Sequence, residues 1–383
     1  MIGKGLRGVF YLISIMISLN LTERDRILRI FERKEVDRVP WMPRIDHWYN
    51  FNRTMGTLPK EFKDLSLSQI YFKLNAYWRC YRHPYIKIHY EGDVEIEYLE
   101  YGDLLITRYK TPIGVLEERR KKVWHKLSSR IIKYLVSELS DIKVLEYILE
   151  NIRYEFSLKE YRELEKHVGK SGMLWYYFPR TPLQRLLINY MGVKRTFIYL
   201  YKYRDKIEGL MESIAKSDDR LYEIVASSPL KILNFGDNID ARITSPKLFK
   251  KYCIPYYQER VDYLHKRNKF IHCHVDGYAK PLLHLFKETG WDGVEALTIQ
   301  PVGDITLKDI KKSLDYEMIL IDGIPYIYFI TSSISLEKFR DFVKEIIHLF
   351  PNKLILGISD ELPPLGDINR VKLVSNIVKK ENL

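Results

Sequence analysis

From about residue 128 onward, the sequence alternates helical patterns with brief apolar runs. The runs are GMLWYYF (172–178), KILNFG (231–236), KFIHCHV (269–275), GVEALTI (293–299), EMILIDG (317–323) and KLILGIS (353–359). Short apolar runs separated by helices are typical of buried parallel strands joined by crossover helices. RVPWM (38–42) and one strand from residues 85–110 bring the number to eight. Because eight such units close a barrel, the expected fold class is α/β, a single (β/α)8 TIM barrel.

Residues 85–124 have a different pattern, in which polar and apolar residues alternate between Gly and Pro residues. This pattern predicts a β-hairpin insertion near residues 93–124. The tyrosine-rich stretch before it, up to about Arg82, is expected to be helical. Residues 21–383 are therefore interpreted as one TIM-barrel domain.

Residues 1–20 contain two basic residues and then an apolar run from Val9 to Leu19, which resembles a signal peptide. The run is too short to cross a membrane, and no small-residue cleavage site follows it. We therefore interpret this segment as an extension outside the fold, and we expect neither a membrane nor a secretory location.

Charge and cysteine content narrow the classes of function. The net charge is +12, but basic residues alternate with acidic ones along most helices, so no nucleic-acid partner is expected. A positive field also attracts a polycarboxylate or phosphorylated small molecule. The three cysteines (Cys80, Cys253 and Cys273) have no paired spacing, which indicates a reducing cytoplasm. Neither a glycine-rich phosphate loop nor a GxSxG motif occurs, which disfavours nucleotide chemistry and serine hydrolysis.

Polar residues stand at the carboxyl end of each expected strand, the side on which barrel enzymes build their active sites. These candidate site residues are Arg44, Asp46, Arg180, Asp237, Asn238, Asp240, His274, Asp276, Glu295, Asp322, Asp360 and Glu361. Any one of them could be a loop cap, but the whole set favours a site.

The sharpest cluster is HCHVDG at residues 272–277. Side chains alternate along a strand, so His274 and Asp276 are expected to face the barrel mouth while Cys273 lies behind. Together with Asp360, or with Glu361 in reserve, they could hold zinc or iron. The alternative is a site without metal, in which the same groups act as acid, base or substrate anchor. The residues alone leave both open.

Five segments, in order along the chain, resemble the uroporphyrinogen decarboxylase superfamily, which includes corrinoid-dependent thiol methyltransferases. They are LTERDRILRIFERKEVDRVP, YKTPIGVLEE, NFGDNIDARITSPKLFKKYCIPYYQ, HCHVDGYAKPLLHLFKETGWDGVEAL and ILGISDELPP, which begin at residues 21, 109, 234, 272 and 355. The resemblance implies a (β/α)8 barrel. In the methyltransferases, one histidine and two cysteines hold zinc. Here His274 matches the histidine, whereas Asp276 and Asp360 occupy the cysteine positions.

The resemblance therefore implies a methyltransferase-like enzyme with a corrinoid or related methyl donor. His274, Asp276 and Asp237 are the candidate catalytic residues. Substrate-binding candidates are Arg44, Asp46, Arg180, Asn238, Asp240 and Glu295. Zinc or no cofactor, a corrinoid co-substrate, a corrinoid protein partner and a homodimer are the expectations for cofactors and assembly.

Two other functions remain open. One is decarboxylation of uroporphyrinogen or another aromatic carboxylate, with Asp46 or Asp237 stabilising a cationic intermediate and Arg44 and Arg180 holding carboxylates. The decarboxylases carry an arginine-rich stretch after the first strand, where this chain has PRIDHWYNFNR. The other is a non-catalytic corrinoid- or tetrapyrrole-binding protein.

Overall fold

The computed structural model describes residues 21–123, 127–314 and 318–381. At its centre is a six-stranded parallel sheet, in which each strand pairs with the next along the chain. The strands are β9 (Tyr176–Phe178), β10 (Ile232–Phe235), β11 (Phe270–His274), β12 (Gly293–Glu295), β13 (Ile319–Pro325) and β14 (Leu354–Ser359). Nearly all of their residues are buried, which explains why these sequences are continuous apolar runs.

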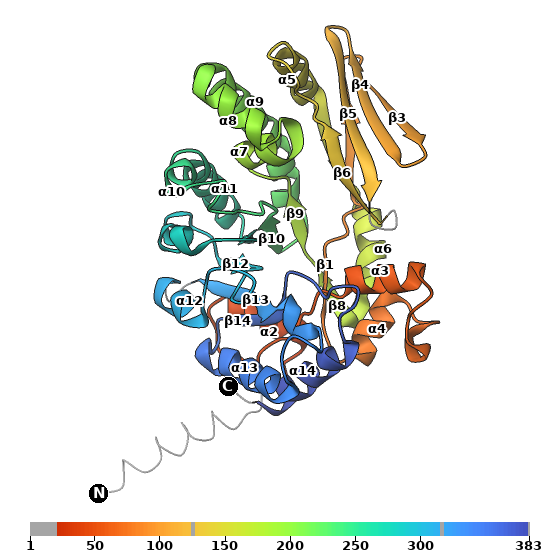
Figure 1. Ribbon diagram of the computed structural model, residues 1–383, viewed down its shortest axis with the longest axis vertical. Helices are drawn as coiled ribbons and strands as arrows, with labels where there is room; N and C mark the ends of the chain where they lie inside the picture. The colour runs from red at the N-terminus through yellow and green to blue at the C-terminus, as the bar shows by residue number, and fades with distance from the viewer. Residues whose placement is uncertain (1–20, 124–126, 315–317, 382–383) are drawn as a thin grey trace, which may run out of the picture.

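Helices alternate with these strands, and Figure 1 shows α8 to α14 arranged around one side of the parallel strands. The helices as far as residue 227 are α2 (Glu23–Phe31), α3 (Asp46–Thr54), α4 (Leu67–Lys73), α5 (Asp141–Asn151), α6 (Leu158–Val168), α7 (Pro182–Arg185), α8 (Val193–Lys202) and α9 (Arg204–Ser227). Those after it are α10 (Pro246–Leu248), α11 (Ile254–His265), α12 (Leu307–Ser313), α13 (Leu336–Leu349) and α14 (Ile368–Lys380). Short π- or 3₁₀-helical turns are η1 (Lys60–Phe62), η2 (Gly169–Ser171), η3 (Leu186–Tyr190), η4 (Phe249–Cys253), η5 (Lys280–Glu288) and η6 (Tyr326–Phe329). The alternation confirms the predicted α/β class.

Further parallel contacts involve the amino-terminal part of the chain. Trp41 forms a parallel bridge to Leu356 in β14, and its carbonyl accepts a hydrogen bond from Tyr77 N at 2.9 Å. The next residues, β1 (Trp78–Cys80), pair in parallel with β8 (Gly172–Leu174). Only Trp175 separates β8 from β9. Parallel contacts therefore run from β14 through Trp41 and β1 to the segment that precedes β9.

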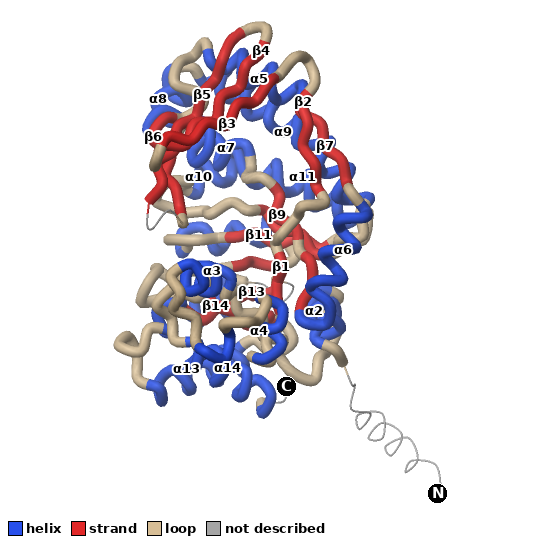
Figure 2. Tube along the Cα trace, turned by 90° about the vertical axis from the view of Figure 1, so that its right-hand side faces the viewer, coloured by secondary structure: helices blue, strands red, loops and turns tan. Residues whose placement is uncertain are grey.

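A four-stranded antiparallel sheet projects from one end of the molecule (Figure 2). Its strands are β3 (Glu95–Tyr101), β4 (Leu104–Thr111), β5 (Gly114–Val123) and β6 (Ser128–Lys133). Beside it, β2 (Ile86–Tyr90) pairs antiparallel with β7 (Ile152–Phe156). The predicted antiparallel insertion is confirmed, but its sheet extends beyond residue 124 to Lys133. Exposed and half-buried residues alternate along β6, which fits a sheet with one solvated face.

One prediction from this region was right only in part, and a second was wrong. The stretch up to Arg82 was expected to be helical, which α3 and α4 confirm, but its end contains the strand β1. All three residues of β1 are buried, so this short strand lacks the alternation by which strands are recognised. The strands within residues 85–110 were expected to supply a member of the parallel sheet, but they pair antiparallel. Instead, β1 forms a parallel pair with β8.

The chain from residue 21 begins with a capped helix, in which the Thr22 side chain accepts a hydrogen bond from Asp25 N. The predicted extension, residues 1–20, lies outside the described residues. None of the helices described is both long and apolar enough to span a bilayer. Cys80, Cys253 and Cys273 are buried free thiols.

Candidate active site

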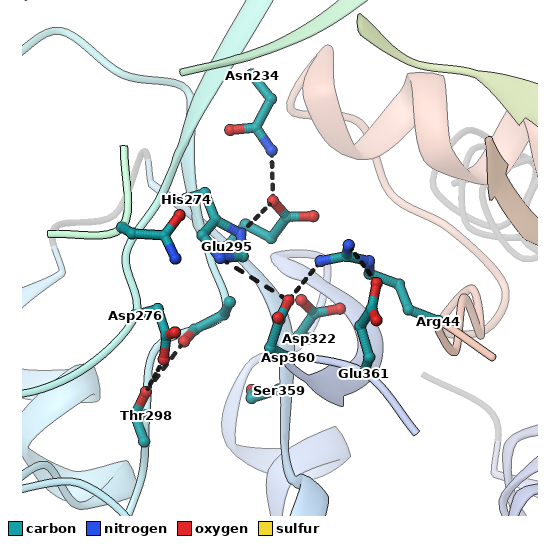
Figure 3. Close-up of polar contacts among 12 residues, drawn as sticks. Arg44, Asn234, His274, Asp276, Glu295, Thr298, Asp322, Ser359, Asp360 and Glu361 are labelled. Atoms are coloured by element: carbon teal, nitrogen blue, oxygen red, sulfur yellow. Dashed lines mark hydrogen bonds and ion pairs between the residues drawn. The ribbon is translucent and has the colours of Figure 1, made fainter. Parts of the chain in front are cut away.

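The candidate site lies where parallel strands end. His274 is the last residue of β11 and Glu295 the last of β12, while Asp360 directly follows β14. In Figure 3, Glu295 lies between Asn234 and His274, and Asp360 lies between His274 and Arg44. Adjacent parallel strands thus bring together side chains that are up to 316 residues apart in sequence.

Glu295 is itself fully buried and is the centre of a polar network, which we call the Glu295 hub. Burial opposes its charged form, but Arg79 and the hydrogen bond with His274 outweigh burial and hold the pKa of Glu295 well below its usual value. Both oxygens are fully engaged. The partners are Arg79, Tyr81 (2.9 Å), Tyr177 (2.9 Å), Asn234 and His274 (2.9 Å).

Arg79 joins Glu295 to a second buried carboxylate, Asp322. Its guanidinium donates to Glu295, to Asp322 and to the carbonyl of Met42. Burial and the charge of Glu295 raise the pKa of Asp322 to about 7, against the opposing effect of Arg79. Asp322 was predicted to follow a strand end, but it lies inside β13 and is fully buried. It therefore supports Arg79 instead of facing a ligand.

His274 accepts or donates hydrogen bonds at one ring nitrogen, whereas its other ring nitrogen has only a longer ion-pair contact. Its Nδ1 lies 2.9 Å from both Glu295 Oε2 and the Tyr177 hydroxyl, while Nε2 lies 3.8 Å from Asp360 Oδ1. Burial lowers the pKa of His274, but Asp360 and Glu295 together outweigh burial and raise it. A carboxylate on Nδ1 fixes the ring and leaves Nε2 to exchange a proton with a substrate.

A cavity of about 540 Å³ adjoins His274, and we call it the site cavity. Its polar lining residues include Arg44, His83, Tyr177, Arg180, Asn238, His274 and Asp360. Its apolar wall includes Ile86 and Ile88 of β2, Tyr154 of β7 and Phe178 of β9. This cavity is large enough for a small organic substrate, and it combines an apolar wall with a few polar groups, as ligand sites do.

Arg44 pairs with two carboxylates at or near the site cavity. It forms ion pairs with Asp360 and with Glu361, the latter at 2.6 Å, and His47 lies 3.5 Å from Glu361. Asp360 is the only carboxylate among the described residues that line the site cavity. The cavity lining is therefore cationic on balance, which favours an anionic substrate or an anion that forms during reaction.

Several predicted site residues lie away from the site cavity. Asp237 is buried and accepts hydrogen bonds from Thr181 N (2.6 Å) and the Tyr257 hydroxyl. Asp46 accepts from Tyr71 (2.9 Å) and Trp78 (3.2 Å), and Asp240 pairs with Arg242. The structure thus places Arg44, Arg180, Asn238, His274 and Asp360 on the site cavity, and Glu295 directly behind His274.

The proposed metal ligands do not assemble. The described residues contain no group of three or more His, Cys, Asp or Glu side chains arranged to hold a metal ion. Asp276 accepts a hydrogen bond from Thr298 at 3.1 Å, while Asp360 and the reserve ligand Glu361 are both paired with Arg44. With their oxygens committed to cations and hydroxyl groups, these side chains do not fit a zinc or iron centre.

Four residues of the Glu295 hub were missed from the sequence: Arg79, Tyr81, Tyr177 and Asn234. A signal was available for two of them, since a charged residue in AYWRCY and an amide in KILNFG each interrupt an apolar run. A polar side chain inside a buried run needs a partner, so it indicates a buried network.

These features define an enzyme-like α/β protein with a polar site at its parallel strand ends. The family described as uroporphyrinogen decarboxylase (URO-D) matches residues 183–380, and the chain belongs to that family, whose members are enzymes. The resemblance noted in the sequence is thus confirmed.

Among solved structures, a methyltransferase from Methanosarcina mazei is similar, with a TM-score of 0.60 and 12% identity over 94% of this chain and 99% of that chain. At this identity the similarity concerns the fold. A D-psicose 3-epimerase from Clostridium cellulolyticum H10 matches with a TM-score of 0.33 and 10% identity over 59% of this chain and 82% of that one, too low for any inference. No curated protein sequence matches.

Proposed function

We propose that the chain is a methyl-transfer enzyme that activates its acceptor by acid–base catalysis at His274. The observation that carries the proposal is the geometry of this imidazole: Glu295 binds it at Nδ1, and His274 lines the site cavity. A raised pKa makes the neutral imidazole a stronger base. The methyl donor is a corrinoid or a related compound, in keeping with the predicted co-substrate.

In the proposed step, the acceptor X–H gives its proton to His274 Nε2 as the X–CH3 bond forms. The bond between the methyl group and its donor breaks, and the donor keeps that electron pair. Arg180, which has no salt bridge among the described residues, lines the site cavity and favours the anionic form of the acceptor. No step is assigned to a metal, because the residues around His274 do not fit one.

The charge of the site cavity favours methyl transfer over a reaction through a cation. In the alternative decarboxylation, Asp46 or Asp237 would stabilise a cationic intermediate, but neither is among the residues that line the site cavity. Asp360, which does line it, is already paired with Arg44. A protonated ring would therefore meet cationic groups in this site.

Decarboxylation of an aromatic carboxylate is the second candidate function. It is favoured by Arg180, which lines the site cavity and has no salt bridge among the described residues. Arg180 could hold a substrate carboxylate, and imidazolium at His274 could protonate the carbon from which CO2 leaves.

We propose that the parallel segments of residues 21–381 close into one eight-stranded (β/α)8 barrel, and that this barrel is a single domain. The support is the hydrogen bond from Met42 N to Leu356 O (2.8 Å), the β1–β8 pairing and the hydrogen bond from Trp175 N to Cys80 O (3.0 Å).

The test is to supply the purified chain with methylcobalamin and a panel of thiol and phenol acceptors, with and without EDTA. CO2 release from uroporphyrinogen is measured in parallel. We expect methylated product in the presence of EDTA, reduced by roughly 10²- to 10⁴-fold in His274→Ala. His284→Ala removes an exposed histidine outside the site cavity and should leave the rate unchanged.

An equal rate in His274→Ala would overturn the role of His274. CO2 release without methyl transfer would replace the proposal by the second candidate. Tight corrinoid binding that His274→Ala leaves unchanged, with neither reaction, would indicate the non-catalytic binding protein.

A further inference from the structure

A second cavity, of about 420 Å³, lies between the antiparallel sheet and the segment that contains α7 and η3. We call it the sheet cavity. Tyr154, Pro179 and Arg180 line both this cavity and the site cavity, so the two adjoin at these residues. A molecule that occupied both would therefore pass Arg180.

The wall of the sheet cavity is formed by one face of the antiparallel sheet. Tyr98, Thr107 and Glu118 are directly opposite one another on β3, β4 and β5, so their side chains share that face. Tyr109, two residues after Thr107 on β4, lies on the same face, and Tyr190 lines the cavity from η3. Aromatic side chains thus surround the sheet cavity on more than one side.

The charged residues of the two cavities are almost all paired. In the sheet cavity, Arg120 donates to Glu118 at 2.5 Å, and Arg185 contacts both oxygens of Asp218 at 2.9 Å. In the site cavity, Arg44 is paired with Asp360. These pairs neutralise the charge that each of these arginines brings.

Arg180 differs from the other three arginines. It has no salt bridge among the described residues, and its Nε is buried without a hydrogen-bond partner. Its one side-chain hydrogen bond in the described part of the chain is a long one from Nη2 to Asn238 Oδ1, at 3.4 Å. The negative charge of Asp237 favours the charged form of Arg180. However, both oxygens of Asp237 already accept hydrogen bonds, from Thr181 and Tyr257. A buried N–H without an acceptor and a guanidinium charge without a carboxylate partner are both costly, so this arginine favours an anionic ligand.

The geometry points to a substrate that carries a carboxylate, held by the guanidinium group of Arg180, and an aromatic extension that lies in the sheet cavity. This inference rests on the proposed function, because it names the substrate class of the same site. The planar guanidinium edge matches a carboxylate in a bidentate pair. The tyrosines supply stacking and edge contacts for the extension, and the reacting group points toward His274.

The experiment measures binding by calorimetry, independently of turnover. The probes are biphenyl-4-carboxylate, its neutral analogue biphenyl-4-carboxamide, and benzoate, which lacks the second ring. We expect the carboxylate to bind wild-type protein more tightly than the carboxamide, and Arg180→Gln to weaken it roughly tenfold to a hundredfold. Arg180→Lys, which keeps the charge but not the planar edge, should weaken it less than Arg180→Gln.

Two further variants complete the design. Tyr109→Ala should reduce the preference for biphenyl-4-carboxylate over benzoate roughly twofold to tenfold. Arg242→Gln removes an exposed arginine outside both cavities and should change no affinity. Thermal unfolding of each variant identifies those that fail to fold, and Arg180→Lys keeps the test informative if Arg180→Gln is among them.

Equal affinities for carboxylate and carboxamide, or unchanged carboxylate binding in a folded Arg180 variant, would overturn the inference. So would an unchanged biphenyl preference in Tyr109→Ala. Failure of the proposed function is distinguishable. His274→Ala should retain probe binding, and Arg180-dependent binding without methyl transfer would remove the proposed reaction while the binding site stands.

Discussion

The Glu295 hub and the antiparallel sheet use the same chemistry, arginine between two carboxylates, in opposite environments. In the hub, Arg79 joins Glu295 and Asp322, and all three side chains are fully buried. In the sheet, Arg108 joins Glu97 (3.2 Å) and Glu117 (2.8 Å), but its side chain is 34% exposed. From this difference we infer that burial, and not the identity of the ion pair, decides what the pair contributes to stability.

Water screens the sheet pairs and competes with them, so exposed pairs of this kind generally contribute little to stability. In the hub, each charge was removed from water and depends on its partners, so loss of one partner leaves an unpaired buried charge. The same coupling sets the proton affinity of His274. Substitutions in the hub should therefore have larger effects than substitutions in the antiparallel sheet.

Arg79→Ala should have the largest effect. It leaves Glu295 and Asp322 buried without their cation, so we expect the free energy of unfolding to fall by about 3–5 kcal/mol. Urea unfolding followed by circular dichroism measures this loss. A change no larger than that of an exposed arginine would show that the hub charges are not held in a dry interior.

Glu295→Gln should reduce turnover roughly 10²-fold, because the amide no longer fixes the His274 ring through a charged acceptor. It also removes a charge that raises the pKa of His274, so that pKa should fall. Neutral imidazole is the active base, and turnover rises as pH rises through this pKa. The acidic limb of the rate profile should therefore shift to lower pH. An unshifted limb would contradict the coupling of Glu295 to His274.

Asp322→Asn should change how stability depends on pH. The folded-state pKa of Asp322 is about 7, above its ordinary value of 3.8, so the folded state binds this proton more tightly. Its contribution is fully present below about pH 4 and is lost as pH rises toward 7, by at most about 1.4 kcal/mol per pH unit. The variant should lose less stability than wild type between pH 5 and 8 in urea unfolding. An equal loss of stability in the variant and in the wild-type protein over this pH range would contradict the prediction.

Arg108→Ala should have the smallest effect. Its partners remain solvated when it is removed, so the urea midpoint should stay within experimental error of wild type. This variant is the matched control for Arg79→Ala. A loss of stability comparable to that of Arg79→Ala would show that burial does not explain the difference between the two regions.

The α/β class and most parallel strands could be predicted because each strand is a buried apolar run between helices. The antiparallel sheet was also predictable, since its half-exposed strands alternate. β1 could not be recognised, because three buried residues, Trp78 to Cys80, carry no periodicity. Its partner β8 is 94 residues away in sequence, so no local signal links them.

The candidate site was predictable in part. His274, Glu295 and Asp360 were identified because polar residues at strand ends converge in such folds. The arrangement of Asp276 and Asp237 could not be predicted, since their partners, Thr298 and Tyr257, come from separate loops and helices. The commitment of Arg44 to Asp360 and Glu361, which removes two expected metal ligands, likewise depends on tertiary structure.

The long-range contacts of the site have a consequence for the order in which the molecule assembles. Arg79 bonds Glu295 and Asp322, which are 216 and 243 residues later in the chain, and Arg44 bonds Asp360, 316 residues later. During synthesis, these two arginines are made before the carboxylates with which they pair. We expect the amino-terminal strands to stay loosely packed until the last strand emerges, so the site forms only when the whole sheet is in place.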